Sequence, residues 1–166
     1  PETFDIIVSE PSNPWISGVS NLFTREFLTM GKTRLKPGGV WSQWIQMYGM
    51  DDQDLTSLLA TFADVYPHVL LFSTVDDADL VLLGSEEPVA LDPQAFDTMM
   101  RRWPRAGAEL RKVQMVDGLT MTASFLLDRD AILEMAGDVP RNTDDNMRIE
   151  YAAPLNLHRE TQDANA

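Results

Sequence analysis

Short apolar runs alternate with longer stretches of helical periodicity along this chain. Residues 4–9 form an apolar run typical of a strand buried on both faces of a parallel sheet, and residues 40–47 predict a second strand. Residues 68–74 and 79–85 predict two more strands, and the short segment between them favours an antiparallel hairpin. The alternation of strands with helical segments indicates an α/β fold.

Two helices are predicted between these strands. The first has Thr24 as its N-cap and ends before the turn at 36–39 (Lys-Pro-Gly-Gly), with an inward face of Phe27, Leu28, Gly31 and Leu35. The second starts at Asp51 and Asp54, and Pro67 stops it. It is the clearest amphipathic helix in the chain, because apolar residues recur at helical spacing: Leu55, Leu58, Leu59, Phe62 and Val65.

The segment that follows is mainly helical. Asp92 and Pro93 are an N-cap followed by proline at the first helical position. The face of this helix is expected to carry Phe96, Met99, Met100 and Trp103. Residues 106–113 predict another helix, whereas the apolar run at 119–127 fits a helix or a strand equally well.

Shorter elements are predicted toward the C-terminus. Residues 130–136 form a short helix closed by Gly137, and residues 142–146 form a polar loop. A short strand is expected at 148–152, and residues 155–166 are expected to be a flexible tail. The sequence has no internal repeat or low-complexity linker, so we expect one domain.

Candidate chemistry lies where the first strand ends. Glu10, Ser12 and Asn13 follow this strand directly, and Pro11 and Pro14 restrict the backbone of the loop. In open parallel α/β sheets, ligands bind beyond the carboxyl ends of the strands. The residues alone leave two interpretations open, namely a ligand-binding loop or an ordinary turn.

Composition excludes several classes of function. The 166 residues include 44% hydrophobic residues, which suits one globular domain. The net charge of −13, from 26 acidic and 13 basic residues, argues against nucleic acid as a partner, because no local basic patch is present. An acidic surface suits a cationic substrate, but it is also a common means of staying soluble.

Metal and disulfide chemistry are not expected. The chain has no cysteine, which fits a reducing, cytoplasmic location, and its two histidines, His68 and His158, share no ligand spacing with another donor. No apolar run approaches the roughly 20 residues of a membrane span, and the start lacks the pattern of a signal peptide.

Several motifs together resemble the spermidine synthase-like aminopropyltransferases. They are Glu10-Pro11-Ser12-Asn13-Pro14-Trp15, Leu22-Phe23-Thr24-Arg25-Glu26-Phe27, Leu35-Lys36-Pro37-Gly38-Gly39-Val40 and Gln43, with Asn142 to Asn146 further on. The chain is similar to the divergent bacterial type, because the family's "Asp-Ser-Ser-Asp-Pro" loop here reads Glu-Pro-Ser-Asn-Pro. The resemblance is strongest over residues 4–50 and returns at 120–154.

This resemblance implies the C-terminal half of a Rossmann-like methyltransferase fold. It would comprise the fourth to seventh strands with flanking helices, and the last two strands would form the antiparallel hairpin. Residues 1–154 would then be a partial domain that lacks the N-terminal, cofactor-binding half. The fragment itself would bind no cofactor, since its parent's co-substrate is decarboxylated S-adenosylmethionine.

The resemblance also implies roles for individual residues. Glu10 would accept a proton from the attacking amine of a polyamine such as putrescine, unless it only caps a helix or pairs with an arginine. Asn13 stands where the family has a second Asp, so the charge that binds the amine is missing there. The remaining substrate-binding candidates each have a structural alternative, as loop, sheet or turn residues: Ser12, Trp15, Gln43, Asp144 and Asp145.

Two further expectations follow. If the first half of the domain is absent, residues 4–9 become an apolar sheet edge, and we expect a homo-oligomer formed through this strand. An S-adenosylmethionine-dependent methyltransferase of the same fold and a non-catalytic binding or assembly module remain alternative functions.

Overall fold

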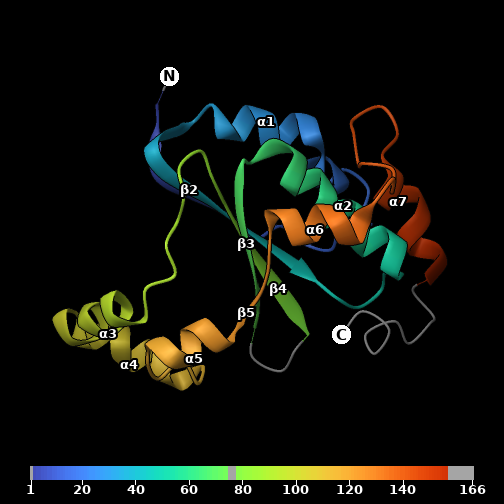
Figure 1. Ribbon diagram of the computed structural model, residues 1–166. Helices are drawn as coiled ribbons and strands as arrows, with labels where there is room; N and C mark the ends of the chain where they lie inside the picture. Colours follow the sequence, from blue (N-terminus) through green and yellow to red (C-terminus); the bar gives the residue numbers. More distant parts are fainter. Residues whose placement is uncertain (1, 75–77, 157–166) are drawn as a thin grey trace.

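The computed structural model describes residues 2–74 and 78–156 of the chain, and its centre is a 5-stranded sheet (Figure 1). The strands are β1 (Phe4–Ser9), β2 (Leu35–Gln46), β3 (His68–Ser73), β4 (Asp79–Ser85) and β5 (Phe125–Asp128). Their order in the sheet is β1-β2-β4-β3-β5. β1 is parallel to β2, and the other pairs are antiparallel. This mixed α/β sheet is consistent with a Rossmann-like methyltransferase fold, as predicted.

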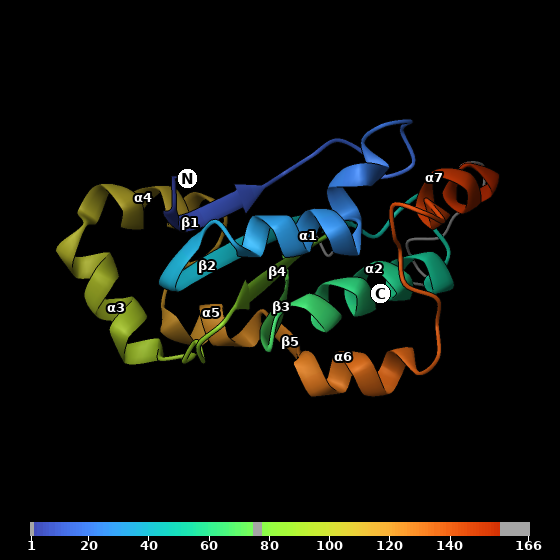
Figure 2. The same cartoon turned by 90° about the horizontal axis from the view of Figure 1, so that it is seen from above.

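Three helices cover one face of the sheet. α1 (Arg25–Lys32), α2 (Asp52–Val65) and α6 (Arg129–Ala136) lie side by side in front of the strands (Figure 2). The core lies between this layer and the sheet, since alternate residues of the strands point toward the helices. The sheet contributes Trp41, Ile45, Val69, Leu71, Leu80 and Leu82, all buried.

The predicted helix starts are confirmed by their caps. The Thr24 hydroxyl accepts a hydrogen bond from the Phe27 N–H, and the Asp51 carboxylate accepts one from the Asp54 N–H. Gly31 brings α1 close to β2, because a methyl group at this position would lie 2.1 Å from a ring carbon of Trp41. The 36–39 turn is a bulge within β2, where the register shifts between Phe4 and Ile6 of β1.

The predicted hairpin is also confirmed. β3 and β4 pair from His68 and Ser85 to Ser73 and Leu80. The residues between them at 75–77 lie outside the described ranges. The ambiguous run at 119–127 contains both kinds of element, because helix α5 (Gly118–Ala123) ends just before β5 begins.

A small helical lobe lies apart from the helical layer. It consists of α3 (Pro93–Arg102), α4 (Pro104–Lys112) and α5, which appear at the lower left in Figure 1. The Asp92 carboxylate caps α3 by accepting from the Gln94 and Ala95 N–H groups. Trp103 does not share the buried face of α3, contrary to the prediction, since the helix ends at Arg102 and this side chain is 55% exposed.

The predicted strand at 148–152 is wrong, because this segment is helix α7 (Arg148–Ala152), followed by the 3-10 helix η3 (Ala153–Asn156). Its alternation of polar and apolar residues resembles a strand, but the side chains that it buries are Ile149 and Ala153, which are four residues apart on one helical face. The predicted tail falls largely outside the described residues.

No helix within 2–74 and 78–156 combines the length and apolar character that a membrane crossing requires.

The apolar run of β1 predicted a strand buried on both faces. This prediction is wrong, because β1 lies at the edge of the sheet. Only β2 pairs with it, and Ile6 and Val8 are 65% and 68% exposed. Apolar runs of this kind are typical of central strands, so the exposed face marks where a further partner would pack. The predicted apolar edge is therefore present.

We expect the 166-residue chain to associate with a second copy through β1, because this edge has free backbone hydrogen-bonding groups beside exposed apolar side chains. Ile6→Lys and Val8→Lys together should shift the chain to monomer in light scattering after size exclusion. Leu155→Lys, at another exposed apolar residue, is the matched control and should leave the oligomer intact. A wild-type monomer at high micromolar concentration would contradict this expectation.

Candidate functional site

The loop after β1 lies at the edge where β1 and β2 both end. The two strands are parallel, and Ser9 of β1 is aligned with Gln43 of β2. Glu10 therefore begins a loop beside the last residues of β2, which ends at Gln46. The carboxyl ends of neighbouring parallel strands form the ligand-binding edge in this fold class.

Trp15 anchors this loop. Its ring packs against the core and lies over Gly49, where a methyl group would come within 2.3 Å of a ring carbon. Gly49 also has a φ of +74°, which other residues rarely adopt. Of the two roles predicted for Trp15, anchoring is thus the one with a visible contact.

The polar residues of the loop differ in exposure. Glu10 and Ser12 are exposed, and Asn13 and Trp15 are half-buried. Within the described part of the chain, the Glu10 carboxylate has no hydrogen bond or ion pair, so it neither caps a helix nor pairs with an arginine there. It is therefore available to a ligand.

Gln43 is held inside the protein. Its Oε1 accepts a hydrogen bond from Trp41 Nε1 at 3.1 Å, and its Nε2 donates to the Trp44 carbonyl at 3.2 Å. The side chain is buried on the face of the sheet that carries the helices. These contacts give Gln43 a structural task in this chain.

Gln46 differs from Gln43, because within residues 2–74 and 78–156 it is buried without hydrogen bonds from its side chain. It was not among the site residues predicted from the sequence. This residue is 0% exposed, yet neither its Oε1 nor its Nε2 has a hydrogen-bond partner in the described residues. Its neighbour across the sheet is Asp79 of β4, whose Oδ1 is also buried without a partner. In the sequence, Gln46 is a polar residue within an apolar stretch at the end of a predicted strand. This position was the one feature of the sequence that could have indicated a buried polar side chain.

The predicted polar loop at 142–146 holds the fold together through Asn142. This buried side chain donates from Nδ2 to the Phe23 carbonyl and accepts at Oδ1 from the Ile149 N–H. Its backbone N–H donates to the Thr61 hydroxyl, and its carbonyl accepts from the Arg25 N–H. Asn142 thereby joins α1, α2 and α7.

Asp144 and Asp145 are exposed on the same loop. The Asp144 N–H donates to Glu26 Oε2 at 3.0 Å, which ties the loop to the first turn of α1. This contact fits the turn interpretation.

The Ser17 hydroxyl and the Gly18 N–H donate to the Glu150 carboxylate, so α7 also holds the segment after Trp15.

A buried ion pair lies at the start of α2. Asp54 is fully buried, and its Oδ1 is 3.3 Å from Nη2 of Arg148 on α7, without hydrogen-bond geometry. Burial raises the pKa of Asp54 to about 6, and the nearby Asp51 charge adds to the rise, whereas Arg148 opposes it.

No group of three or more His, Asp or Glu side chains in residues 2–74 and 78–156 is arranged to hold a metal ion. A cavity of 1220 Å³ is present, but none of the predicted site residues lines it. It lies between the β3–β4 hairpin and the helical lobe. The loop with Glu10 is therefore a separate part of the surface.

Comparison with known proteins supports the fold class. No family model and no curated protein matches this sequence. The structure is similar to that of a probable spermidine synthase from Corynebacterium glutamicum, with a TM-score of 0.51 and 18% identity over 87% of this chain. The chain spans 48% of that protein's chain, so it corresponds to about half of its length. The fold is thus spermidine synthase-like.

Asp54 should make stability depend on pH. Its folded-state pKa of about 6 lies above the ordinary value of 3.8, so the folded state binds the extra proton. Stability should therefore rise as pH falls through about 6 and level off below about 4, with a total gain of about 2–3 kcal/mol. Urea unfolding of wild type and Asp54→Asn between pH 4 and 7.5 measures this as the difference between the two proteins.

Asp138→Asn, at an exposed carboxylate beyond α6, is the control and should keep the wild-type pH profile. A constant difference between wild type and Asp54→Asn across this range would mean that Asp54 stays ionised in the folded state.

Proposed function

We propose that this chain is the C-terminal half of the catalytic domain of a polyamine aminopropyltransferase. The whole domain would transfer an aminopropyl group from decarboxylated S-adenosylmethionine to an amine such as putrescine. Two findings support this proposal, namely the spermidine synthase-like fold and the motif resemblance over residues 4–50.

The observation that carries the proposal is the position of Glu10. Its carboxylate directly follows the end of β1, beside β2, which continues from Gln43 to Gln46, and it is exposed. A carboxylate at this edge suits a positively charged nitrogen, which it can attract and then relieve of a proton.

The reaction requires that proton to leave. An alkylammonium nitrogen has no lone pair, so Glu10 would accept its proton before or during attack. The nitrogen then bonds to the aminopropyl carbon while the carbon–sulfur bond of the sulfonium breaks. The electron pair of that bond stays on sulfur, and neutral methylthioadenosine leaves. No metal is needed for this displacement.

The other loop residues would position the amine. Ser12 and Asn13 offer hydrogen-bonding oxygens near Glu10, and Asn13 lacks the charge of the Asp that the family has there. Trp15 would support the loop through its contact with Gly49. Asp144 and Asp145 would add negative charge near the site. The nucleoside would be held by the other half of the domain, so the 166 residues alone should be inactive.

The test uses the complete gene product that contains this sequence. It is incubated with putrescine or another amine and either decarboxylated S-adenosylmethionine or S-adenosylmethionine, and products are measured by mass spectrometry. Aminopropylated amine and methylthioadenosine are expected. Turnover of S-adenosylmethionine alone would instead assign a methyltransferase, and binding without turnover would assign a non-catalytic module.

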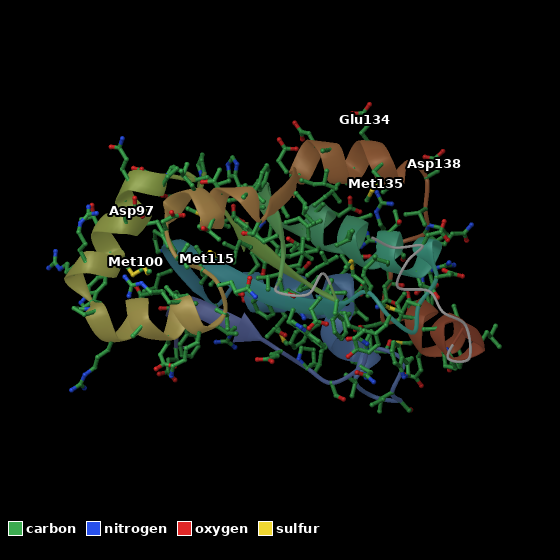
Figure 3. The ribbon with its side chains drawn as sticks, turned by 90° about the horizontal axis from the view of Figure 1, so that it is seen from below. Asp97, Met100, Met115, Glu134, Met135 and Asp138 are labelled. Carbon is green, nitrogen blue, oxygen red and sulfur yellow. The ribbon has the colours of Figure 1, made fainter. Side chains whose placement is uncertain are left out.

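Glu10→Gln in that protein should lower kcat/KM for the amine by a factor of about 10² to 10⁴, since the proton acceptor is lost. Glu134→Gln, at an exposed glutamate on α6 away from the loop, should retain wild-type activity (Figure 3). Equal activity of Glu10→Gln and Glu134→Gln would rule out the role of Glu10.

A further inference from the structure

The cavity of 1220 Å³ lies on the face of the sheet opposite the layer of α1, α2 and α6. Leu80 and Leu82 of β4 are buried in the core beneath that layer. The alternate residues, Val81 and Leu83, therefore point to the opposite face, where they line the cavity. α3 contributes Phe96 to the lining, and the volume is large enough for a drug-sized ligand.

The large apolar side chains around the cavity are not fully packed. They come from the sheet and from the helical lobe, and all are half-buried: Phe72, Phe96, Met99, Met115 and Met121. Protein interiors are normally close-packed, so side chains left in this state around a cavity keep apolar surface that a ligand can cover. Methionine is unbranched, so this lining can also adjust to the shape of a ligand.

The hydroxyl groups that line the cavity are already paired within the protein. Each donates a hydrogen bond to a nearby protein oxygen, over 2.7 to 3.5 Å. They belong to Ser73, Thr74, Thr120 and Ser124. The other neutral polar side chain of the lining, Gln114, is exposed. A polar ligand would therefore lose its hydrogen bonds to water and gain few in exchange.

The charges at the cavity disfavour an ionic ligand. The charged residues that line it are Asp79 and Asp92, and no basic side chain of the described residues does so, which leaves an anion among like charges. Asp79 Oδ1 is closed off from solvent, and Asp92 Oδ1 already accepts two backbone N–H groups as the cap of α3. A cation would exchange its hydration for apolar walls, because neither of these oxygens is presented to it.

We propose that the cavity binds an uncharged, mainly apolar molecule that contains an aromatic ring. Phe72 and Phe96 offer ring contacts, and the sulfur atoms of Met99, Met115 and Met121 suit the edge of an aromatic ligand. The site is distinct from the loop after β1, and this binding does not depend on the proposed transferase activity.

The experiment titrates the 166-residue chain at pH 7 with N-phenyl-1-naphthylamine, an uncharged fluorescent probe. 8-Anilino-1-naphthalenesulfonate has the same rings and adds one negative charge, so it is the matched anion. The uncharged probe should bind saturably at one site, with an affinity about tenfold or more above that of the sulfonate. 1-Naphthalenemethanol should displace it at a concentration about tenfold lower than the matched cation, 1-naphthylmethylammonium.

The nine methionines allow the site to be located, because their methyl groups can be labelled selectively with ¹³C for NMR. The methyl signals of Met99, Met115 and Met121 should shift when N-phenyl-1-naphthylamine binds. Those of Met30 on α1 and Met135 on α6 should not, although both side chains are more than half exposed.

Filling the cavity should remove the binding. Met115→Trp and Met121→Trp should each lower the affinity for N-phenyl-1-naphthylamine about tenfold or more, because the larger side chain takes up the space of the ligand. Met135→Trp is the matched control, at an exposed methionine on the other side of the molecule in Figure 3, and should leave the affinity unchanged. Circular dichroism checks that each variant is folded.

Several results would overturn the proposal. They are the absence of saturable binding, equal or tighter binding of the sulfonate or the ammonium compound, methyl shifts confined to methionines outside the cavity, and affinity that neither folded tryptophan variant at the cavity lowers. An affinity that falls as the protein concentration rises would also overturn it, since a second copy would then occupy the cavity. None of these results bears on Glu10, because no co-substrate is present.

Discussion

The parallel pairing of β1 with β2 is the interaction on which the rest of this structure depends. It aligns Ser9 with Gln43, so the loops that follow both strands meet at one edge of the sheet. The contact of Trp15 with Gly49 then fixes the two loops against each other. The same pairing puts β1 at the border of the sheet and exposes Ile6 and Val8. The exposed polar loop and the exposed apolar strand at the sheet edge thus have one origin.

The C-terminal segment completes this arrangement from a distance in the sequence. Asn142 joins the starts of α1 and α7 to α2, and Glu150 holds the segment after Trp15. Buried polar groups of this kind specify one packing, because each leaves an unsatisfied partner if the packing changes. Within the motif at 142–146, Asn142 therefore has a structural role. The two exposed aspartates of the motif, Asp144 and Asp145, are still candidates for the site at the loop after β1.

Local signals in the sequence were sufficient for much of the fold. The caps at Thr24, Asp51 and Asp92 and the β3–β4 hairpin are determined by neighbouring residues, and all were predicted. Features that depend on tertiary packing were not. Alternation at 148–152 resembled a strand, but burial of Ile149 and Ala153 selects a helix. The polar pair of Gln46 and Asp79 arises from strand register, which no local pattern reveals.

The two faces of the sheet are covered differently. One is covered by three helices, whereas the other carries the cavity of 1220 Å³ and the buried, unpaired polar atoms of Gln46 and Asp79.

The most direct test of this account is the backbone register of β1 on β2, measured by nuclear Overhauser effects on the isotopically labelled chain. Contacts between Ile7 and Trp41 and between Val8 and Ser42, in the pattern of parallel strands, are predicted. Antiparallel contacts, or none between these strands, would contradict the account.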